Sequence, residues 1–168
     1  MRKVASVLLV AVIGAGAAWA AAVAVHKPSV YQDGLYGFSL QGPAFPAAEK
    51  GSNVTPVMLL GPAQNGFAGN VNVMVQQVAV TRDAYRKIST DGFKAAGFKV
   101  NADRNMTVSG KDAILFDYEG TQQGLQLRFL ALAVIDKERV FVVTGTALKD
   151  SFPEKEFMAC LNSFRLGA

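Results

Sequence analysis

The chain has 168 residues, 51% of them hydrophobic, and a formal net charge of +4, which allows one folded domain behind a targeting segment. Without Arg2 and Lys3, which precede an apolar run, 15 of the 17 basic residues remain against 13 acidic ones. This weak and dispersed excess of positive charge excludes a typical nucleic-acid-binding surface. The single cysteine, Cys160, excludes an internal disulfide and a cysteine-based metal site.

The N-terminal segment, residues 1–25, contains an apolar run from Val4 to Val25 of about 22 residues, or roughly 33 Å of helix. Two interpretations stay open. The segment is either a cleavable signal peptide, with small residues at positions 18 and 20 or 22 and 24, or an uncleaved signal anchor that crosses the membrane as an apolar helix. Both predict that the rest of the chain is exported. Residues 26–33 are expected to form a linker, followed by a domain at 34–168.

The first part of this domain alternates apolar and polar residues, which is typical of β-strands. The pattern predicts strands at Leu35–Leu40, Thr55–Leu60 and Asn70–Gln76, and the first two end at Gly-Pro pairs. A polar loop is expected at Ala47–Asn53. A glycine-containing turn is expected at Gln64–Gly69.

The spacing of apolar residues changes between Thr81 and Ala96 and predicts an amphipathic helix. Thr81 is a suitable N-cap, and Gly97 suits the position after the helix ends. The polar face is basic, so it could contact acidic lipid or an acidic partner, although a solvated helix face is the simpler interpretation. Its basic residues are Arg82, Arg86, Lys87 and Lys94.

The most apolar stretch after the N-terminus, Leu125–Ala147, consists of two runs around a charged tetrapeptide and predicts a β-hairpin. Apolar residues occupy both faces of the first run, so the hairpin is expected in the middle of a sheet that is covered on both sides. Strands are also expected at Phe98–Val108 and Asp112–Gly120. A loop of four residues, Thr121–Gly124, is expected to join the last of these to the hairpin.

A four-residue loop sets the register of the strands on either side of it. In this register Phe116 lies opposite Phe129, and Tyr118 lies opposite Leu127. On the other face, the paired residues are Asp117 with Arg128 and Glu119 with Gln126.

Near the C-terminus, Ser151 and Glu154 have the spacing of a capping box, which predicts a helix with Ser151 as its N-cap. Phe157 to Phe164 then form a broad apolar arc. The elements together predict an α+β fold, with a mainly antiparallel sheet of about six or seven strands and helices packed on both faces.

Three short motifs carry a resemblance to a known family. They are Tyr36–Leu40 followed by Pro43 and Pro46, the turn at Val108–Ala113, and the closing segment Leu161–Leu166. Over residues 30–166 the chain resembles the PsbP-like superfamily, including the DcrB-related bacterial envelope proteins. The resemblance implies an α-β-α sandwich and a non-enzymatic accessory role. It supplies no catalytic residues and no cofactor, and the lipoprotein cysteine of some exported members is missing here.

The residues whose side chains could take part in catalysis have simpler structural interpretations. The only histidine, His26, lies at the boundary of the targeting segment, which disfavours a histidine-based catalytic set. Cys160 lies in the apolar arc of the last helix, where a small buried side chain is expected. Asp117 and Glu119 share one strand face and could act as paired carboxylates, but a cross-strand ion pair with Arg128 is favoured.

The sequence therefore predicts an exported or membrane-anchored, non-enzymatic binding or accessory protein of the cell envelope, whose partner is an envelope protein. Loops on a rigid sheet often carry recognition, so the expected binding surface lies on the polar loops at 64–70 and 121–124. One alternative is a carrier of a small apolar ligand or lipid. The ligand would lie between the helix at 81–96 and the sheet, in contact with Tyr85, Phe93, Phe116 and Phe129. A second and less favoured alternative is a hydrolase. The candidate binding residues are Gln64, Asn65, Asn70, Gln122 and Gln123.

Overall fold

The computed structural model describes residues 29–45, 47–50 and 55–167, with side chains described everywhere except at 47–50. The expected signal segment at 1–25 with its apolar helix, and His26, lie outside these residues. Among the described residues, no helix is both long and apolar enough to cross a membrane.

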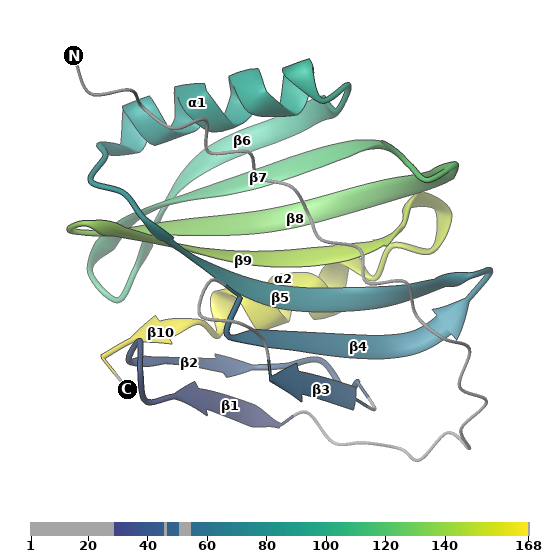
Figure 1. The fold of residues 1–168 in the computed structure, drawn as a ribbon, viewed down its shortest axis with the longest axis horizontal. Helices are drawn as coiled ribbons and strands as arrows, with labels where there is room; N and C mark the ends of the chain where they lie inside the picture. Colours follow the sequence, from purple (N-terminus) through teal and green to yellow (C-terminus); the bar gives the residue numbers. More distant parts are fainter. Residues whose placement is uncertain (1–28, 46, 51–54, 168) are drawn as a thin grey trace.

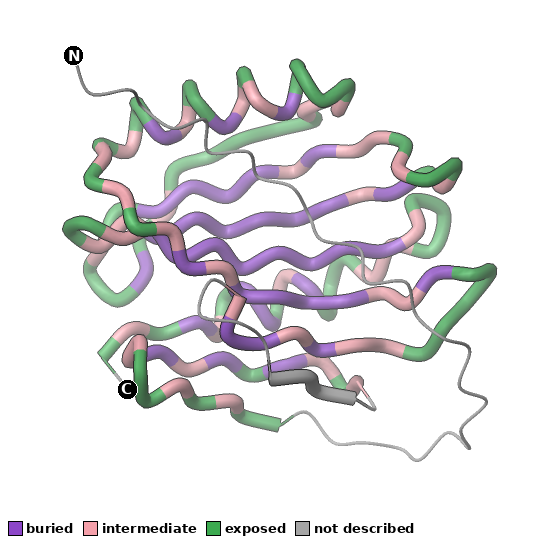
Figure 2. Tube along the Cα trace, viewed as in Figure 1, coloured by how far each residue is buried: buried purple, intermediate pink, exposed green. Residues whose placement is uncertain are grey.

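Seven strands form one antiparallel sheet in the order β3-β4-β5-β9-β8-β7-β6 (Figure 1). The hairpin expected in the middle of the sheet is confirmed as β8 and β9, which both have partner strands on each side. The strands at the centre are buried and β6 at the edge is exposed (Figure 2). The seven strands are β3 (Ala47–Lys50), β4 (Val57–Gln64), β5 (Phe67–Gln77), β6 (Lys99–Val108), β7 (Lys111–Gln122), β8 (Leu125–Asp136) and β9 (Arg139–Leu148).

A second sheet of three strands brings together the two ends of the described chain. Its order is β1-β2-β10, with β1 at Val30–Asp33, β2 at Phe38–Gln41 and β10 at Arg165–Leu166. The sequence pattern did not predict this sheet, because strands of two to four residues are too short to show alternation. The strand β1 thus lies inside the stretch at 26–33 that we expected to be a linker.

The predicted helix at 81–96 is observed as α1 (Arg82–Ala95). Thr81 caps it as expected, because its hydroxyl accepts a hydrogen bond from the Ala84 N–H at 3.3 Å. The helix contacts β6 and β7. Its buried Tyr85 and Phe93 belong to one apolar cluster, which also contains Ile114, Phe116, Tyr118, Leu127, Phe129, Ala131, Val140 and Val142 from the sheet.

The C-terminal helix, α2 (Glu154–Asn162), contacts β8, β9 and β2 and packs into a different cluster. Phe38 and Leu40 of β2 belong to this cluster too, so α2 and the small sheet share one apolar layer. The mainly antiparallel sheet with two helices is confirmed, whereas the expected α-β-α sandwich did not include the small sheet. The α2 side contributes Phe157, Cys160 and Leu161, and the main sheet contributes Val71, Val73, Leu115, Leu130, Leu132, Phe141 and Val143.

The expected register between β7 and β8 is wrong by two residues. Tyr118 lies opposite Phe129 and Glu119 lies opposite Arg128, because the turn contains only two residues, Gln123 and Gly124. Both have positive φ angles, of 50° and 80°, as the tight hairpin turn requires. A shift of two residues leaves every side chain on its original face, so the expected division into two faces is correct.

Two other local predictions are wrong. The loop expected at Ala47–Asn53 contains the edge strand β3, which pairs with β4. The expected capping box does not form, because Ser151 ends a short 3₁₀ helix, η1 (Lys149–Ser151), and Pro153 occupies the N-cap position of α2 without a side-chain hydrogen bond. The fixed φ angle of Pro153 ends the segment before it and separates Ser151 from the start of α2. The capping-box pattern considers only Ser151 and Glu154 and therefore misses this constraint.

Candidate functional site

One end of the main sheet brings together three connections: the β4–β5 turn, the β7–β8 turn and the η1 segment that follows β9 (Figure 1). A pocket of about 270 Å³ lies among them. It has apolar walls from two leucines and a polar rim. The lining residues are Asn65, Leu125, Gln126, Leu148, Lys149, Asp150 and Ser151.

Four of the five candidate binding residues lie at this end of the sheet. Asn65 lines the pocket, and Gln64 precedes it at the exposed end of β4. Gln122 and Gln123 lie in and beside the β7–β8 turn, where Gln122 pairs with the lining residue Leu125. The fifth candidate, Asn70, is buried on β5 and is not part of this group. The two loops thus flank one pocket, and their role in binding stays a prediction.

The two turns have the same tight backbone conformation. Asn65 and Gln123 each have a φ angle of 50° and precede a glycine with positive φ. Two-residue hairpin turns of this type match the twist of the strands and leave little conformational freedom. Between them, Gln126 donates a hydrogen bond of 2.8 Å from Nε2 to Thr121 Oγ1. Side chains at this end can therefore contact a partner from a rigid frame.

Beside the pocket, Glu119 is held by cations from two directions. Lys149, which also lines the pocket, places its Nζ 3.1 Å from Glu119 Oε1, and Lys99 lies 3.5 Å from the same oxygen. Asn101 donates to the other oxygen at 3.4 Å. The hydrogen bond from Lys149 is the main reason why the pKa of Glu119 lies below its usual value.

Arg128 forms the centre of a second ionic group on the same face. Its guanidinium binds Asp117 with two hydrogen bonds, of 3.1 and 2.7 Å, and contacts Glu154 at the start of α2 at 3.0 Å. It also lies 4.8 Å from the centre of the Phe152 ring. The expected ion pair between Asp117 and Arg128 is therefore confirmed, although the two residues are diagonal neighbours rather than directly opposite.

The carboxylate of Glu119 gives a testable dependence of stability on pH. Because its pKa is lowered in the folded state, its contribution is present above the unfolded-state pKa of about 4.3 and is lost as the pH falls through the folded-state value. We expect Glu119→Gln to lower the free energy of unfolding by less than about 1 kcal/mol at pH 7, since the ion pairs are partly solvated. In urea denaturation, the difference from the wild type should start to shrink as the pH falls below about 4.3 and should vanish once the pH lies below the folded-state pKa. A difference that stays constant from pH 7 to pH 3 would assign the effect to packing instead.

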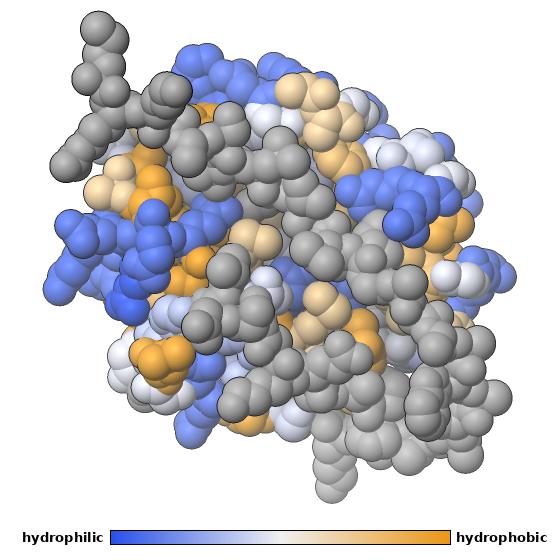
Figure 3. Space-filling view, viewed as in Figure 1, coloured by the Kyte–Doolittle hydropathy of each residue, from blue (hydrophilic) through white to orange (hydrophobic). Residues whose placement is uncertain are grey.

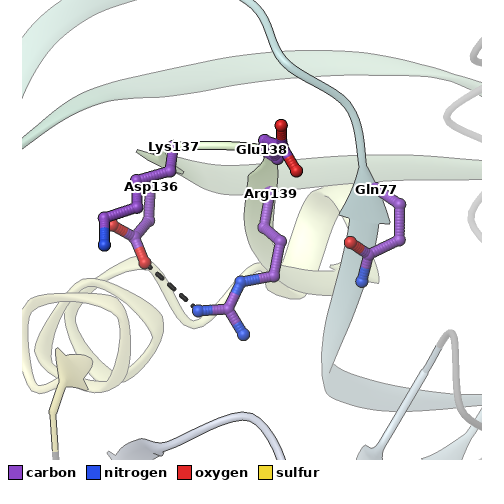
Figure 4. Close-up of a pocket in the computed structure, with 5 residues that line it drawn as sticks. All are labelled: Gln77, Asp136, Lys137, Glu138 and Arg139. Atoms are coloured by element: carbon purple, nitrogen blue, oxygen red, sulfur yellow. Dashed lines mark hydrogen bonds and ion pairs between the residues drawn. The ribbon is translucent and has the colours of Figure 1, made fainter.

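The opposite end of the sheet carries a larger pocket of about 380 Å³, which is formed by a charged turn (Figure 4). Asp136 contacts Lys111 at 2.9 Å and Arg139 at 3.3 Å, and the hydrogen bond from Lys111 is the main cause of its lowered pKa. Lys137 and Glu138 form the turn itself, and Gln77 of β5 lies across from it. The charges of Asp136 and Arg139 are thus already paired within the turn.

The side chains considered for catalysis or metal binding have structural roles. Cys160 is 2% exposed, and burial raises the pKa of its thiol to about 12, so the reactive thiolate is disfavoured. Asp117 and Glu119 are each bound to cations rather than to one another. Among the described residues, no group of three or more histidine, cysteine, aspartate or glutamate side chains could hold a metal ion.

The basic face of α1 is largely neutralised by neighbouring carboxylates. Arg82 contacts Asp112 at 2.9 Å and Lys87 contacts Asp91 at 2.8 Å. Arg86 contacts Asp103 on β6. This pairing supports the interpretation of a solvated helix face over that of an acidic-lipid or acidic-partner surface.

The aromatic residues considered for an apolar ligand form closely packed core instead. Tyr118 stacks on Phe93 and on Phe129, with ring centres 4.1 and 4.7 Å apart, and Phe93 meets Phe116 edge to face. Tyr85 and these four rings are each at most 3% exposed. Neither of the two pockets described above lies between α1 and the sheet.

A group of four neutral polar residues on β5 and β9 did not emerge from the sequence. Asn70 lies opposite Thr146 and Asn72 lies opposite Thr144, and none of the four is more than 7% exposed. The Thr146 hydroxyl has no hydrogen-bond partner among the described residues. The alternation in this strand predicted one polar and one dry face, whereas both faces are buried at this position.

Comparisons with known proteins were made at the level of sequence and of structure. No protein-family model matches the sequence, and no curated protein matches it. Among solved structures, the chain is similar to cyanobacterial PsbP (CyanoP) from Synechocystis, with a TM-score of 0.61 and 14% identity over 90% of this chain and 98% of that one.

Two further structures share the same architecture. One is LpqN of Mycobacterium tuberculosis, which is involved in cell envelope biogenesis; its TM-score is 0.58 at 14% identity, over 83% of this chain and 90% of LpqN. The other is a protein of unknown function from Pseudomonas aeruginosa, with a TM-score of 0.54 at 17% identity, over 80% of this chain and 94% of that one. At such identities these likenesses show a common fold.

Proposed function

We propose that this chain, whose fold is PsbP-like, is a non-enzymatic accessory or binding protein of the cell envelope. The observation that carries the proposal is the likeness in fold, over most of both chains, to LpqN and CyanoP. The apolar segment at 1–25, as a cleaved signal or as an anchoring apolar helix, supports export of the domain. In this proposal, the chain has the α-β-α arrangement of the superfamily, and its role resembles that of the DcrB-related envelope proteins.

The binding surface that we propose is the end of the main sheet around the pocket with Asn65 and Gln126. It combines apolar walls from Leu125 and Leu148 with the polar side chains of Asn65 and Gln126 and the charged side chains of Lys149 and Asp150. Protein interfaces use such a mixture of a small apolar centre and a polar rim. Asp150 is the one carboxylate among the lining residues, and the neighbouring Glu119 is paired with Lys149. The pocket therefore does not bring two free carboxylates together, which supports binding over paired acid-base catalysis at this site.

Photocrosslinking in living cells tests this surface. A photoreactive amino acid at Asn65 or Gln123 is expected to capture the same envelope protein, because both residues lie at the same end of the sheet. Lys137 provides a matched control, since it also occupies a positive-φ position in a two-residue turn but lies at the opposite end. Capture of one adduct from positions 65 and 123 and not from 137 would support the proposal. Identical capture from all three positions, or none from 65 and 123 at native abundance, would contradict it.

A further inference from the structure

The exposed hydrophobic side chains are concentrated on one hairpin. Among the described residues, the large hydrophobic side chains exposed to solvent are Val30 at 65%, Leu35 at 75% and Ile88 at 38%. The first two belong to the β1–β2 hairpin, residues 30–41. Figure 3 shows a group of hydrophobic atoms, in orange, at the lower left, where the turn of this hairpin lies in Figure 1. Single exposed hydrophobic residues are common, but two on one short hairpin deserve an explanation.

The hairpin presents Leu35 from a well-bonded turn. Asp33 Oδ1 accepts hydrogen bonds from the backbone N–H groups of Leu35 at 3.0 Å and Tyr36 at 2.8 Å. The Gly37 carbonyl accepts a third from Gly167 at the end of the chain, at 2.8 Å. The exposure of Leu35 is therefore built into the fold and does not result from a loose loop.

The hairpin also follows directly after the apolar N-terminal segment. The carbonyl of Ser29 accepts a hydrogen bond of 3.0 Å from the Gly42 N–H, so the domain is bonded to the chain from this residue onward. Ser29 follows Val25 by four positions, and an extended chain covers at most about 14 Å over that stretch. Wherever the apolar segment stays in a membrane, the start of β1 must lie close to its surface.

We infer that the β1–β2 hairpin rests on the membrane surface, with Leu35 and Val30 in the interfacial region of the bilayer. Arg165 of β10, in the same small sheet, is exposed and adds a cation at this side of the molecule, while its Nη1 also donates to the Asn162 and Phe164 carbonyls at 2.7 Å. Asp33 keeps its negative charge while it accepts hydrogen bonds from two N–H groups, so Arg165 offsets this charge and the contact with the bilayer rests mainly on Leu35 and Val30. In this orientation α1, at the far side of the molecule in Figure 1, points away from the bilayer. The inference rests on the envelope location that we propose above.

Site-specific fluorescence measures this orientation directly. Leu35→Cys can be labelled with an environment-sensitive dye, because the native Cys160 is 2% exposed and poorly reactive. Ile88→Cys on α1 is the matched control, since it also replaces a partly exposed aliphatic residue. The full chain is reconstituted in vesicles of phosphatidylethanolamine and phosphatidylglycerol that contain nitroxide-labelled lipid.

The expected result is a blue-shifted emission at position 35 that lipid nitroxides quench at least twofold, with neither effect at position 88. Equal quenching at both positions, or no quenching at 35, would overturn the inference. A change at position 35 that requires added envelope proteins and not lipid would also overturn it and would identify the hairpin as a protein-binding surface. The fluorescence measurement does not involve the pocket around Asn65. The membrane inference can therefore fail while the crosslinking result supports the proposed function, and the proposed binding surface can fail while the fluorescence result supports the membrane inference.

Discussion

Replacing Gly145 by alanine is expected to lower the free energy of unfolding by about 2 kcal/mol. Gly145 lies on β9 directly under α2, and a Cβ atom at this position would lie 2.7 Å from two ring carbons of Phe157. The Phe157 ring is fully buried and has edge-to-face contacts with Phe45 and Phe152, so it has little room to move. The added methyl group must therefore displace α2 from the sheet.

Gly69 on the neighbouring strand is a matched control for this substitution. A Cβ atom there would make only ordinary contacts, the nearest being 3.6 Å to the Thr146 carbonyl oxygen. We expect Gly69→Ala to be neutral or to stabilise the fold by up to about 1 kcal/mol. In urea denaturation, Gly145→Ala combined with Phe157→Leu should recover part of the loss. Equal stability of the two alanine variants would show that α2 does not pack on β9 as described.

Truncating Phe129 to alanine should destabilise the protein more strongly, by about 3–5 kcal/mol. Phe129 is fully buried in the centre of β8, and its ring stacks on Tyr118 and meets Phe98 edge to face. Its removal leaves a cavity that the surrounding rings cannot fill without leaving their contacts. Because ΔG of unfolding for a domain of this size is typically about 5–15 kcal/mol, the variant should lose much of its stability.

The same substitution separates the core from a ligand-binding interpretation of these aromatic residues. If the rings lined a cavity for an apolar ligand, Phe129→Ala would reduce ligand affinity with little effect on the empty protein. For a packed core, the empty protein itself is destabilised, and Phe129→Leu has a smaller effect because it preserves more volume. Ile88→Ala on the outer part of α1 should change stability by less than about 1 kcal/mol and serves as the control. A loss below about 1 kcal/mol for Phe129→Ala would revive the carrier hypothesis.

The long helices and strands were predictable because the spacing of their apolar residues shows directly which residues are buried. The apolar residues of β8 on both faces indicated a central strand, and Thr81 with Gly97 indicated the ends of α1. The register of β7 and β8 was not predictable from the same pattern. A shift of two residues keeps Asp117 and Arg128 on one face, so alternation cannot distinguish the two registers. The Gln-Gly pair at 123–124 was the missing signal, since a glycine with positive φ favours a two-residue turn.

The candidate site was predictable in part for a similar reason. Turn residues such as Asn65 and Gln123 can be predicted because polar residues followed by glycine are typical of turns. The antiparallel order of the strands then brings both turns to one end of the sheet. The part of the pocket lined by Leu148 to Ser151 depends on where α2 starts. The capping-box motif predicted this start incorrectly. Asn70 was expected both to begin the strand at 70–76 and to belong to the accessible surface at 64–70, and it lies within β5 and is 7% exposed. Tertiary burial of this kind leaves no trace in local alternation.

The small sheet determines when the domain can complete its fold. β2 lies near the start of the described residues and its partner β10 near their end, and the Gln41–Ser163 hydrogen bond joins positions 122 residues apart. Such distant pairing imposes a large loop-closure cost and slows folding. Under the export that we propose above, the part of the chain with β2 crosses the membrane before the part with α2 and β10. Phe38 and Leu40 then stay uncovered until the C-terminal part has crossed, so completion of the small sheet reports completion of translocation.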